Sequence, residues 1–90
     1  MKPAALVYLR DNVAAQRLAV AWPLVPDRSR SEKLVVRDWA RLADVPPHQA
    51  EAIAPVLRSH GICRDDGTLV PLAEQYLGAQ VQATIRTARR

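Results

Sequence analysis

Hydrophobic residues near the amino terminus recur with the period of an α-helix. The apolar stripe consists of Leu6, Leu9, Val13 and Val20. No glycine or proline interrupts residues 4–21, and Pro3 suits a first helical turn because the N–H it lacks would have no helical partner there. Pro23 ends the pattern. The sequence therefore predicts one long leading helix over residues 4–21.

A loop and a second apolar stripe follow. Pro26 and a cluster of serine and arginine mark the loop, and the run KLVV at residues 33–36 is either a short strand or the lead-in to a helix. The stripe comprises Val36, Trp39, Ala40 and Ala43. This spacing of three and four residues predicts an amphipathic helix that begins at residue 36.

A proline turn separates this helix from the next. Val45 precedes Pro46-Pro47, and a residue before proline is pushed out of the helical region, whereas Pro47 itself suits a first turn. The inner face of the next helix comprises Ala50, Ile53, Ala54 and Leu57. Pro55 removes one backbone hydrogen bond and should bend this helix, and Gly61 provides a left-handed stop. Residues 36–61 thus have the layout of a helix-turn-helix.

The remaining chain predicts a hairpin and a last helix. Asp66-Gly67 is a two-residue turn signal between short apolar runs, so residues 62–71 are expected to form a hairpin. Residues 72–88 repeat Leu77, Val81 and Ile85 every four positions, which is typical of a helix. No repeat or linker divides the chain, so residues 1–90 are interpreted as a single domain.

The segment VRDWARLADVPPHQAEAIAPVLRSHGICRDDGTLVPLAEQYL, residues 36–77, resembles the winged helix-turn-helix superfamily of DNA-binding proteins. The matching positions are Ala40, Val45, Ala50, Ile53, Leu57, Gly61 and Ile62. The resemblance implies a mainly α fold with a small β-hairpin, in the order helix, helix, turn, helix, hairpin, helix. It places Asp44 at a left-handed turn position where the family usually has glycine. It also places Asp65-Asp66 at the tip of the wing, where DNA-binding wings usually carry basic residues.

The composition of the chain says little about the class of protein. Hydrophobic residues make up 49% of the chain but aromatic residues only 4%, so the core is built mainly from alanine and aliphatic side chains. The 13 Lys and Arg against 9 Asp and Glu give a formal charge of +4, a mild preference for polyanions. Cys63 is the only cysteine, and no segment reads as a signal peptide or a membrane span, so we expect a cytoplasmic protein.

These observations predict a protein that binds double-stranded DNA. The resemblance implies that the second helix of the pair enters the major groove, with His48, Gln49 and Ala52 nearest the bases. The residues expected on phosphates are Arg28, Arg30, Lys33, Arg37, Arg41, Arg58 and Arg64. Glu51 would repel phosphate unless it accepts a hydrogen bond from a cytosine amino group. The role would be that of a transcription regulator or of an accessory factor of a phage or mobile element, as in small stand-alone, phage-like members.

The alternative is a protein-interaction module on the same scaffold. Pro46 and Pro47 would be natural contacts, and Trp22 is either an exposed anchor for a partner or a plug at the end of the core. The leading helix is either a core helix or, with the last helix, a dimerisation element.

Catalytic and metal chemistry find little support. His60 and Cys63 have a spacing that can suit a metal, but a structural zinc site needs four ligands. No nucleophile elbow or glycine-rich phosphate loop is present in the sequence, so neither an enzyme nor a cofactor is expected.

Overall fold

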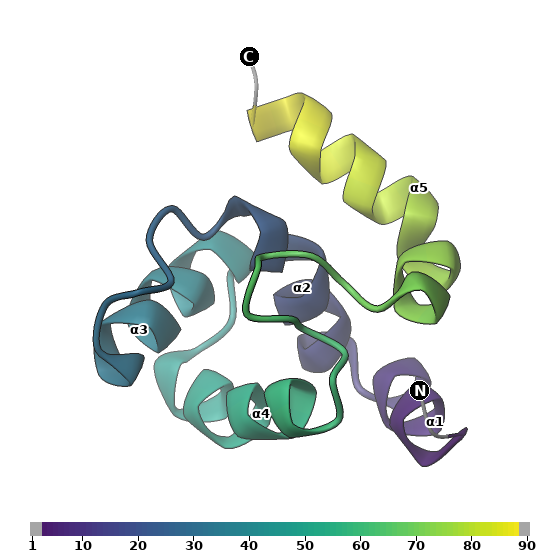
Figure 1. Cartoon of the computed structure of the whole chain (residues 1–90), viewed down its shortest axis with the longest axis horizontal. Coiled ribbons are helices and arrows are strands. Elements are labelled where there is room, and N and C mark those ends of the chain that lie inside the picture. Colours follow the sequence, from purple (N-terminus) through teal and green to yellow (C-terminus); the bar gives the residue numbers. More distant parts are fainter. Residues whose placement is uncertain (1–2, 89–90) are drawn as a thin grey trace.

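The computed structural model of the chain describes the backbone of residues 3–88 and the side chains of residues 4–80. The described part is all-helical. Its elements are α1 (Pro3–Asp11), α2 (Val13–Ala21), the 3-10 turn η1 (Trp22–Leu24), α3 (Glu32–Ala43), α4 (Pro47–Ser59) and α5 (Pro71–Ala88). In the centre of this arrangement lies α2, which packs against α1, α3, α4 and α5 (Figure 1).

The single leading helix predicted over residues 4–21 is wrong, because the chain breaks at Asn12. Asn12 is extended, and its side-chain oxygen caps α2 by accepting a hydrogen bond from the Ala15 N–H at 3.0 Å. Gln16 completes the break from the other side, since its amide donates to the carbonyls of Leu9 and Arg10 at the end of α1. Both helix ends are therefore satisfied without glycine or proline.

Two tryptophans lie at the middle of the core. The rings of Trp22 and Trp39 have centroids 4.5 Å apart, and both side chains are fully buried. Each indole N–H donates to a backbone carbonyl, Trp22 to Arg64 at 2.7 Å and Trp39 to Leu18 at 2.6 Å. Trp22 is thus the plug of the core, and its interpretation as an exposed anchor for a partner is wrong.

The helix pair α3–α4 has the predicted turn, and α3 begins earlier than the apolar stripe suggests. Residues 33–36 are helical, so the strand alternative for KLVV is wrong. Asp44 ends α3 in the left-handed region, with φ 56 and ψ 49, which confirms the turn conformation expected at this position. Pro47 begins α4, which continues through Pro55 to Ser59. Gly61 follows with φ 74, as a left-handed stop requires.

The predicted wing hairpin over residues 62–71 is wrong. The described residues contain no strand, and Cys63 and Leu69 form only an isolated antiparallel bridge. The Asp66-Gly67 turn is present, with Gly67 at φ 88.

Two ladder bonds form, from the Arg64 amide to the Thr68 carbonyl at 2.9 Å and from the Val70 amide to the Ile62 carbonyl at 3.0 Å, and the ladder extends no further because neighbouring backbone groups have other partners. The Ile62 and Cys63 amides donate to Leu57 at the end of α4, and the Arg64 carbonyl accepts from Gly67 and from the Trp22 indole. The Asp66 carboxylate accepts a hydrogen bond from the Thr68 amide. Residues 62–70 are therefore a loop held against the core and not a projecting wing.

The last helix, α5, packs on α2 through its first half. Ala73 and Leu77 are buried, whereas in Figure 1 the second half runs away from the other helices. The side chains of Val81 and Ile85 in the predicted repeat lie outside the described residues. Among the helices that the structure describes, none has the length and apolar character that a membrane span requires.

Candidate nucleic-acid interface

A row of basic side chains runs along α3. Lys33, Arg37 and Arg41 are spaced four residues apart, so they follow one another at about 6 Å along the same side of the helix. All three are exposed. Within the described residues Lys33 and Arg37 form no ion pair, and Arg41 pairs only with Asp38. We call these three residues the basic row.

The basic row adjoins the start of α4 across a shallow groove. The groove has a volume of about 620 Å³ and is lined by Arg37, Ala40, Arg41, Asp44, Val45, Pro46 and Pro47. Its edges are two arginines from α3 and the two prolines that open α4. The turn at Asp44 thus joins the basic row and the exposed start of α4 into one continuous surface.

The predicted base-proximal residues lie on the solvent side of α4. His48, Gln49 and Ala52 are all exposed, and so are Glu51 and Pro55. The opposite side of α4 is buried, through Ala50, Ile53, Ala54 and Leu57. The structure therefore leaves the three predicted base-proximal residues accessible on α4, and none of them lines the groove beside the basic row.

The first turn of α4 is a weak anion site by itself. Pro46 and Pro47 have no N–H, and the Gln49 and Ala50 amides both donate to the Pro46 carbonyl at 3.0 Å. In this first turn only the His48 N–H is left for an incoming phosphate, so the helix end offers less than the usual group of free donors. Phosphate contacts at this surface therefore depend on the side chains of α3.

Two of the predicted phosphate ligands are instead bound within the fold. Arg58 pairs with Glu32 and, at 3.0 Å, with Asp65, and its guanidinium carbon lies 5.7 Å from the centre of the Trp22 ring. These hydrogen bonds, first to Glu32 and then to Asp65, raise the pKa of Arg58 above its usual value. Arg28 lies at the same 5.7 Å from the Trp22 ring and donates to the carbonyls of Val25 and Asp66. We call Arg28 and Arg58 the tryptophan-bound arginines.

The other predicted phosphate ligands differ in how available they are. Arg30 and Arg41 share Asp38, at 2.9 and 2.8 Å, but the Arg41 side chain remains 75% exposed. This carboxylate orients both guanidiniums while leaving most of Arg41 accessible. Arg64 is exposed in the loop after α4 and does not line the groove.

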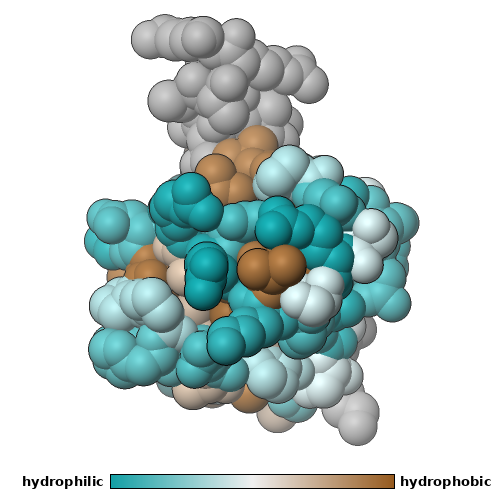
Figure 2. All heavy atoms as spheres, turned by 90° about the vertical axis from the view of Figure 1, so that its left-hand side faces the viewer, coloured by the Kyte–Doolittle hydropathy of each residue, from teal (hydrophilic) through white to brown (hydrophobic). Residues whose placement is uncertain are grey.

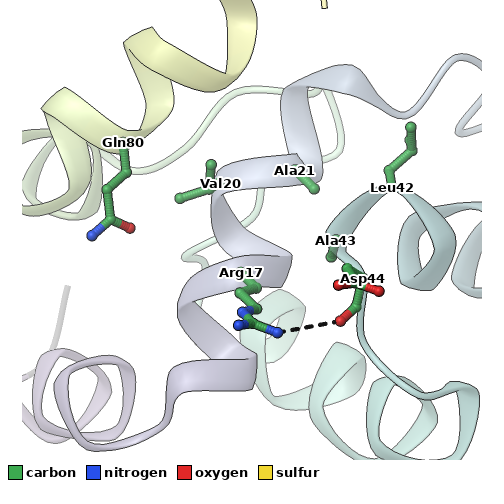
Figure 3. Close-up of a pocket in the computed structure, with 7 residues that line it drawn as sticks. All are labelled: Arg17, Val20, Ala21, Leu42, Ala43, Asp44 and Gln80. Carbon is green, nitrogen blue, oxygen red and sulfur yellow. Dashed lines mark hydrogen bonds between the residues drawn. The ribbon is translucent and has the colours of Figure 1, made fainter. Parts of the chain in front are cut away.

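A second groove, which sequence reasoning missed, lies on the other side of the turn (Figure 3). It measures about 420 Å³ and is lined by Arg17, Val20, Ala21, Leu42, Ala43, Asp44 and Gln80. The Arg17 guanidinium donates to the Asp44 carbonyl at 3.4 Å, where a cation also offsets the dipole at the end of α3. Arg17 and Asp44 are 27 positions apart, so no local pattern could have paired them.

The face that carries α3 is mainly hydrophilic. Figure 2 views the molecule from this side, and hydrophobic residues show there only as separate spots. A large apolar patch is therefore absent from the part of the chain visible in this view, which favours a polar or charged ligand over an apolar partner.

His60 and Cys63, whose spacing can suit a metal, lie in different surroundings. Cys63 is buried and His60 is exposed, and no group of three potential metal ligands lies together in the described part of the chain. Burial raises the pKa of the Cys63 thiol, which the nearby Arg58 opposes only partly. The thiol is therefore a packed core group and not a nucleophile or metal ligand.

Comparison with known proteins adds no relative, since family models, curated proteins and solved structures all fail to match this chain.

Proposed function

We propose that this protein binds double-stranded DNA through the surface formed by α3 and α4. The observation that supports the proposal is the continuity of this surface: the basic row, in which the described residues form no ion pair except Arg41 with Asp38, borders the exposed start of α4 across one groove. A cationic row beside an accessible helix provides the two parts that DNA recognition needs, contacts to phosphates and a helix that fits the major groove.

In the proposed complex the two helices have different tasks. The outward side of α4 enters the major groove, with His48, Gln49 and Ala52 facing the base edges, as the second helix of such a pair does. Lys33, Arg37 and Arg41 contact the phosphates along the edge of the groove. The tryptophan-bound arginines take no part, because their guanidiniums are already held by protein groups.

This assignment limits the electrostatic contribution to about three phosphates. The logarithm of the affinity should then fall with the logarithm of salt with a slope of about −2.7, since each neutralised phosphate contributes about −0.9. Between 50 and 200 mM salt this amounts to a loss of about 40-fold. A protein that used all seven predicted arginines and lysines would show a slope more than twice as steep.

The test is fluorescence anisotropy with a labelled mixed-sequence duplex over this salt range. The double variant Arg37→Ala with Arg41→Ala should reduce the slope by about 1.8 and weaken binding to every sequence. The single variant Arg37→Ala is measured as well, and Arg10→Ala is its matched control. Arg10 is an exposed arginine on α1, away from the groove. An unchanged slope in the double variant, or an equal loss in the control, would contradict the proposal.

In the cell we assign this binding to a transcription regulator or to an accessory factor of a phage or mobile element, acting in the cytoplasm. The support is the combination of a small helical unit with a cationic surface beside an open groove.

A second candidate is a protein contact through α1 and α5. Val7, Leu72 and Tyr76 are 45%, 49% and 48% exposed, which is unusual for large apolar side chains on a small protein. Self-association through these helices would give a dimer with two DNA-contacting surfaces. Light scattering of the wild type and of Tyr76→Ser at several concentrations distinguishes this case, since only a dimer through this surface loses mass in the variant.

A further inference from the structure

The outward line of α4 has an unusual composition for a helix that contacts DNA. The residues farthest from the buried side are His48, Ala52, Pro55 and Ser59. None of them has a carboxylate, ammonium or guanidinium group, and none is longer than histidine. Such a line lets the helix approach the floor of the groove closely, because no long side chain stands between backbone and bases.

Charged side chains of α4 lie at its edge or inside the fold. Arg58 is bound to Glu32 and Asp65 and cannot reach a guanine. Pro47 borders the groove with α3, and Arg58 pairs with Glu32 at the start of α3. Glu51 lies one helical turn after Pro47 and two turns before Arg58, so it is on the same side of α4, toward α3. That side borders the basic row, where Glu51 opposes phosphate instead of facing the bases. The bidentate arginine or lysine contact that selects guanine is therefore missing from this surface.

The chemistry that remains on the outward side fits one kind of base pair. In the major groove thymine presents an apolar C5-methyl group, which alanine and other small apolar side chains contact, and adenine presents the donor and acceptor pair that a glutamine amide matches. Ala52 and Pro55 supply exposed apolar carbon, and Gln49 supplies an exposed amide. The adjoining basic row provides the charge complementarity that holds the helix against the phosphates.

We propose that α4 selects A·T base pairs through their thymine C5-methyl groups, with Ala52 and Pro55 in contact with the methyls and Gln49 bound to adenine. This inference rests on the proposed function, because it specifies which DNA the α3–α4 surface prefers. In this proposal the specificity comes from the burial of thymine methyl groups against α4, and the electrostatic attraction to phosphates comes from α3.

Duplexes that differ only in pyrimidine methylation test this directly. Three duplexes of one length are compared by anisotropy at fixed salt: an A·T-rich duplex, the same duplex with every thymine replaced by uracil, and a G·C-rich duplex. The thymine duplex should bind most tightly, and uracil should weaken binding about 4-fold for each methyl that the helix covers. A G·C duplex that carries 5-methylcytosine, which places the same methyl at the same position, should bind more tightly than its unmethylated form.

A variant pair links the effect to α4. Ala52→Ser turns the apolar methyl into a hydroxymethyl group at an exposed position and should lower the thymine-to-uracil affinity ratio, leaving only the part that comes from Pro55. Ala79→Ser, an equally exposed alanine on α5, should leave the ratio unchanged. Thermal unfolding of both variants ensures that the comparison is between folded proteins.

The outcomes separate the two proposals. Salt-dependent binding with equal affinity for thymine and uracil duplexes would overturn the methyl inference and leave DNA binding in place. A preference for the G·C duplex would also overturn the methyl inference and leave DNA binding in place. Failure to bind any of the duplexes at 50 mM salt would overturn the proposed function, and the inference with it.

Discussion

The tryptophan-bound arginines and the basic row contain the same kinds of residue in very different surroundings. Arg28 and Arg58 flank the buried Trp22 ring, and their guanidiniums are occupied by carboxylates and backbone carbonyls. Lys33 and Arg37 on α3 extend into solvent without an ion pair in the described residues. The first set stabilises the fold, and the second set is free to bind a polyanion.

The difference shows that a basic residue in the sequence is available to a ligand only if the fold leaves its charged group without a partner. Each tryptophan-bound arginine has a partner from a distant part of the chain: Glu32 is 26 positions from Arg58, and Asp66, whose carbonyl accepts from Arg28, is 38 positions from Arg28. A formal charge of +4 therefore does not say which basic groups a ligand can reach, since those beside Trp22 are bound within the fold and those along α3 are exposed.

The largest expected effect is on stability and separates the two sets directly. Arg58→Ala removes two charge-assisted hydrogen bonds and a contact with Trp22, so the free energy of unfolding should fall by about 1–2 kcal/mol. Arg37→Ala, with no partner to lose, should change it by less than about 0.5 kcal/mol. Urea unfolding followed by tryptophan fluorescence measures both.

DNA affinity should show the reverse order in the same two proteins. At a temperature where both are folded, Arg37→Ala should weaken binding and Arg58→Ala should leave it nearly unchanged. Equal effects of the two substitutions on both quantities would remove the distinction between the sets.

A smaller effect tests how Arg28 holds the loop. Gly61 and Gly67 both have positive φ, 74 and 88, so alanine should cost about 1 kcal/mol at either position. A Cβ at Gly61 meets no atom, whereas at Gly67 it would overlap the Arg28 guanidinium. Gly67→Ala should therefore destabilise the protein more than Gly61→Ala does. In an Arg28→Ala background the two substitutions should cost the same, and a difference that persists there would show that Arg28 is not responsible.

The smallest effect is a pH dependence in the same loop. Hydrogen bonds from Thr68, first its hydroxyl and then its amide, lower the pKa of Asp66 below the usual value. A lowered folded-state pKa contributes stability that is present at neutral pH and is lost as the pH falls below about 5 toward that pKa. Asp66→Asn keeps an acceptor for Thr68 but cannot titrate, so its free energy of unfolding should decline less than that of the wild type between pH 7 and pH 3. Glu74→Gln, on the exposed side of α5, should follow the wild type.

Local patterns in the sequence predicted the helices on either side of the proline turn well. The stripes that end at Ala43 and begin at Ala50 are both buried as expected, and Asp44 has the left-handed conformation that a short polar side chain tolerates. These features depend on residues within one or two helical turns of each other, where periodicity and turn chemistry act directly.

The missed features depend on competition for backbone groups. Asn12 breaks the leading helix because its side chain and that of Gln16 together satisfy both helix ends, which an uninterrupted apolar stripe conceals. The wing stays at a single bridge because the Ile62 amide donates to the Leu57 carbonyl at the end of α4 instead of extending the ladder to Val70. For the same reason the predicted phosphate set included Arg58, whose carboxylate partners became visible only in the folded chain.

The central position of α2 has a consequence for how the protein is made. Residues 13–21 are synthesised before α5, but α2 packs against α5, and the Trp22 indole that follows α2 donates to the carbonyl of residue 64. The core therefore stays incomplete, with apolar surface of α2 in contact with solvent, until the segment around Leu77 has been synthesised. Folding of these helices should accordingly be a nearly all-or-none event, in which the pair α3–α4 is stabilised fully only when α5 packs on α2.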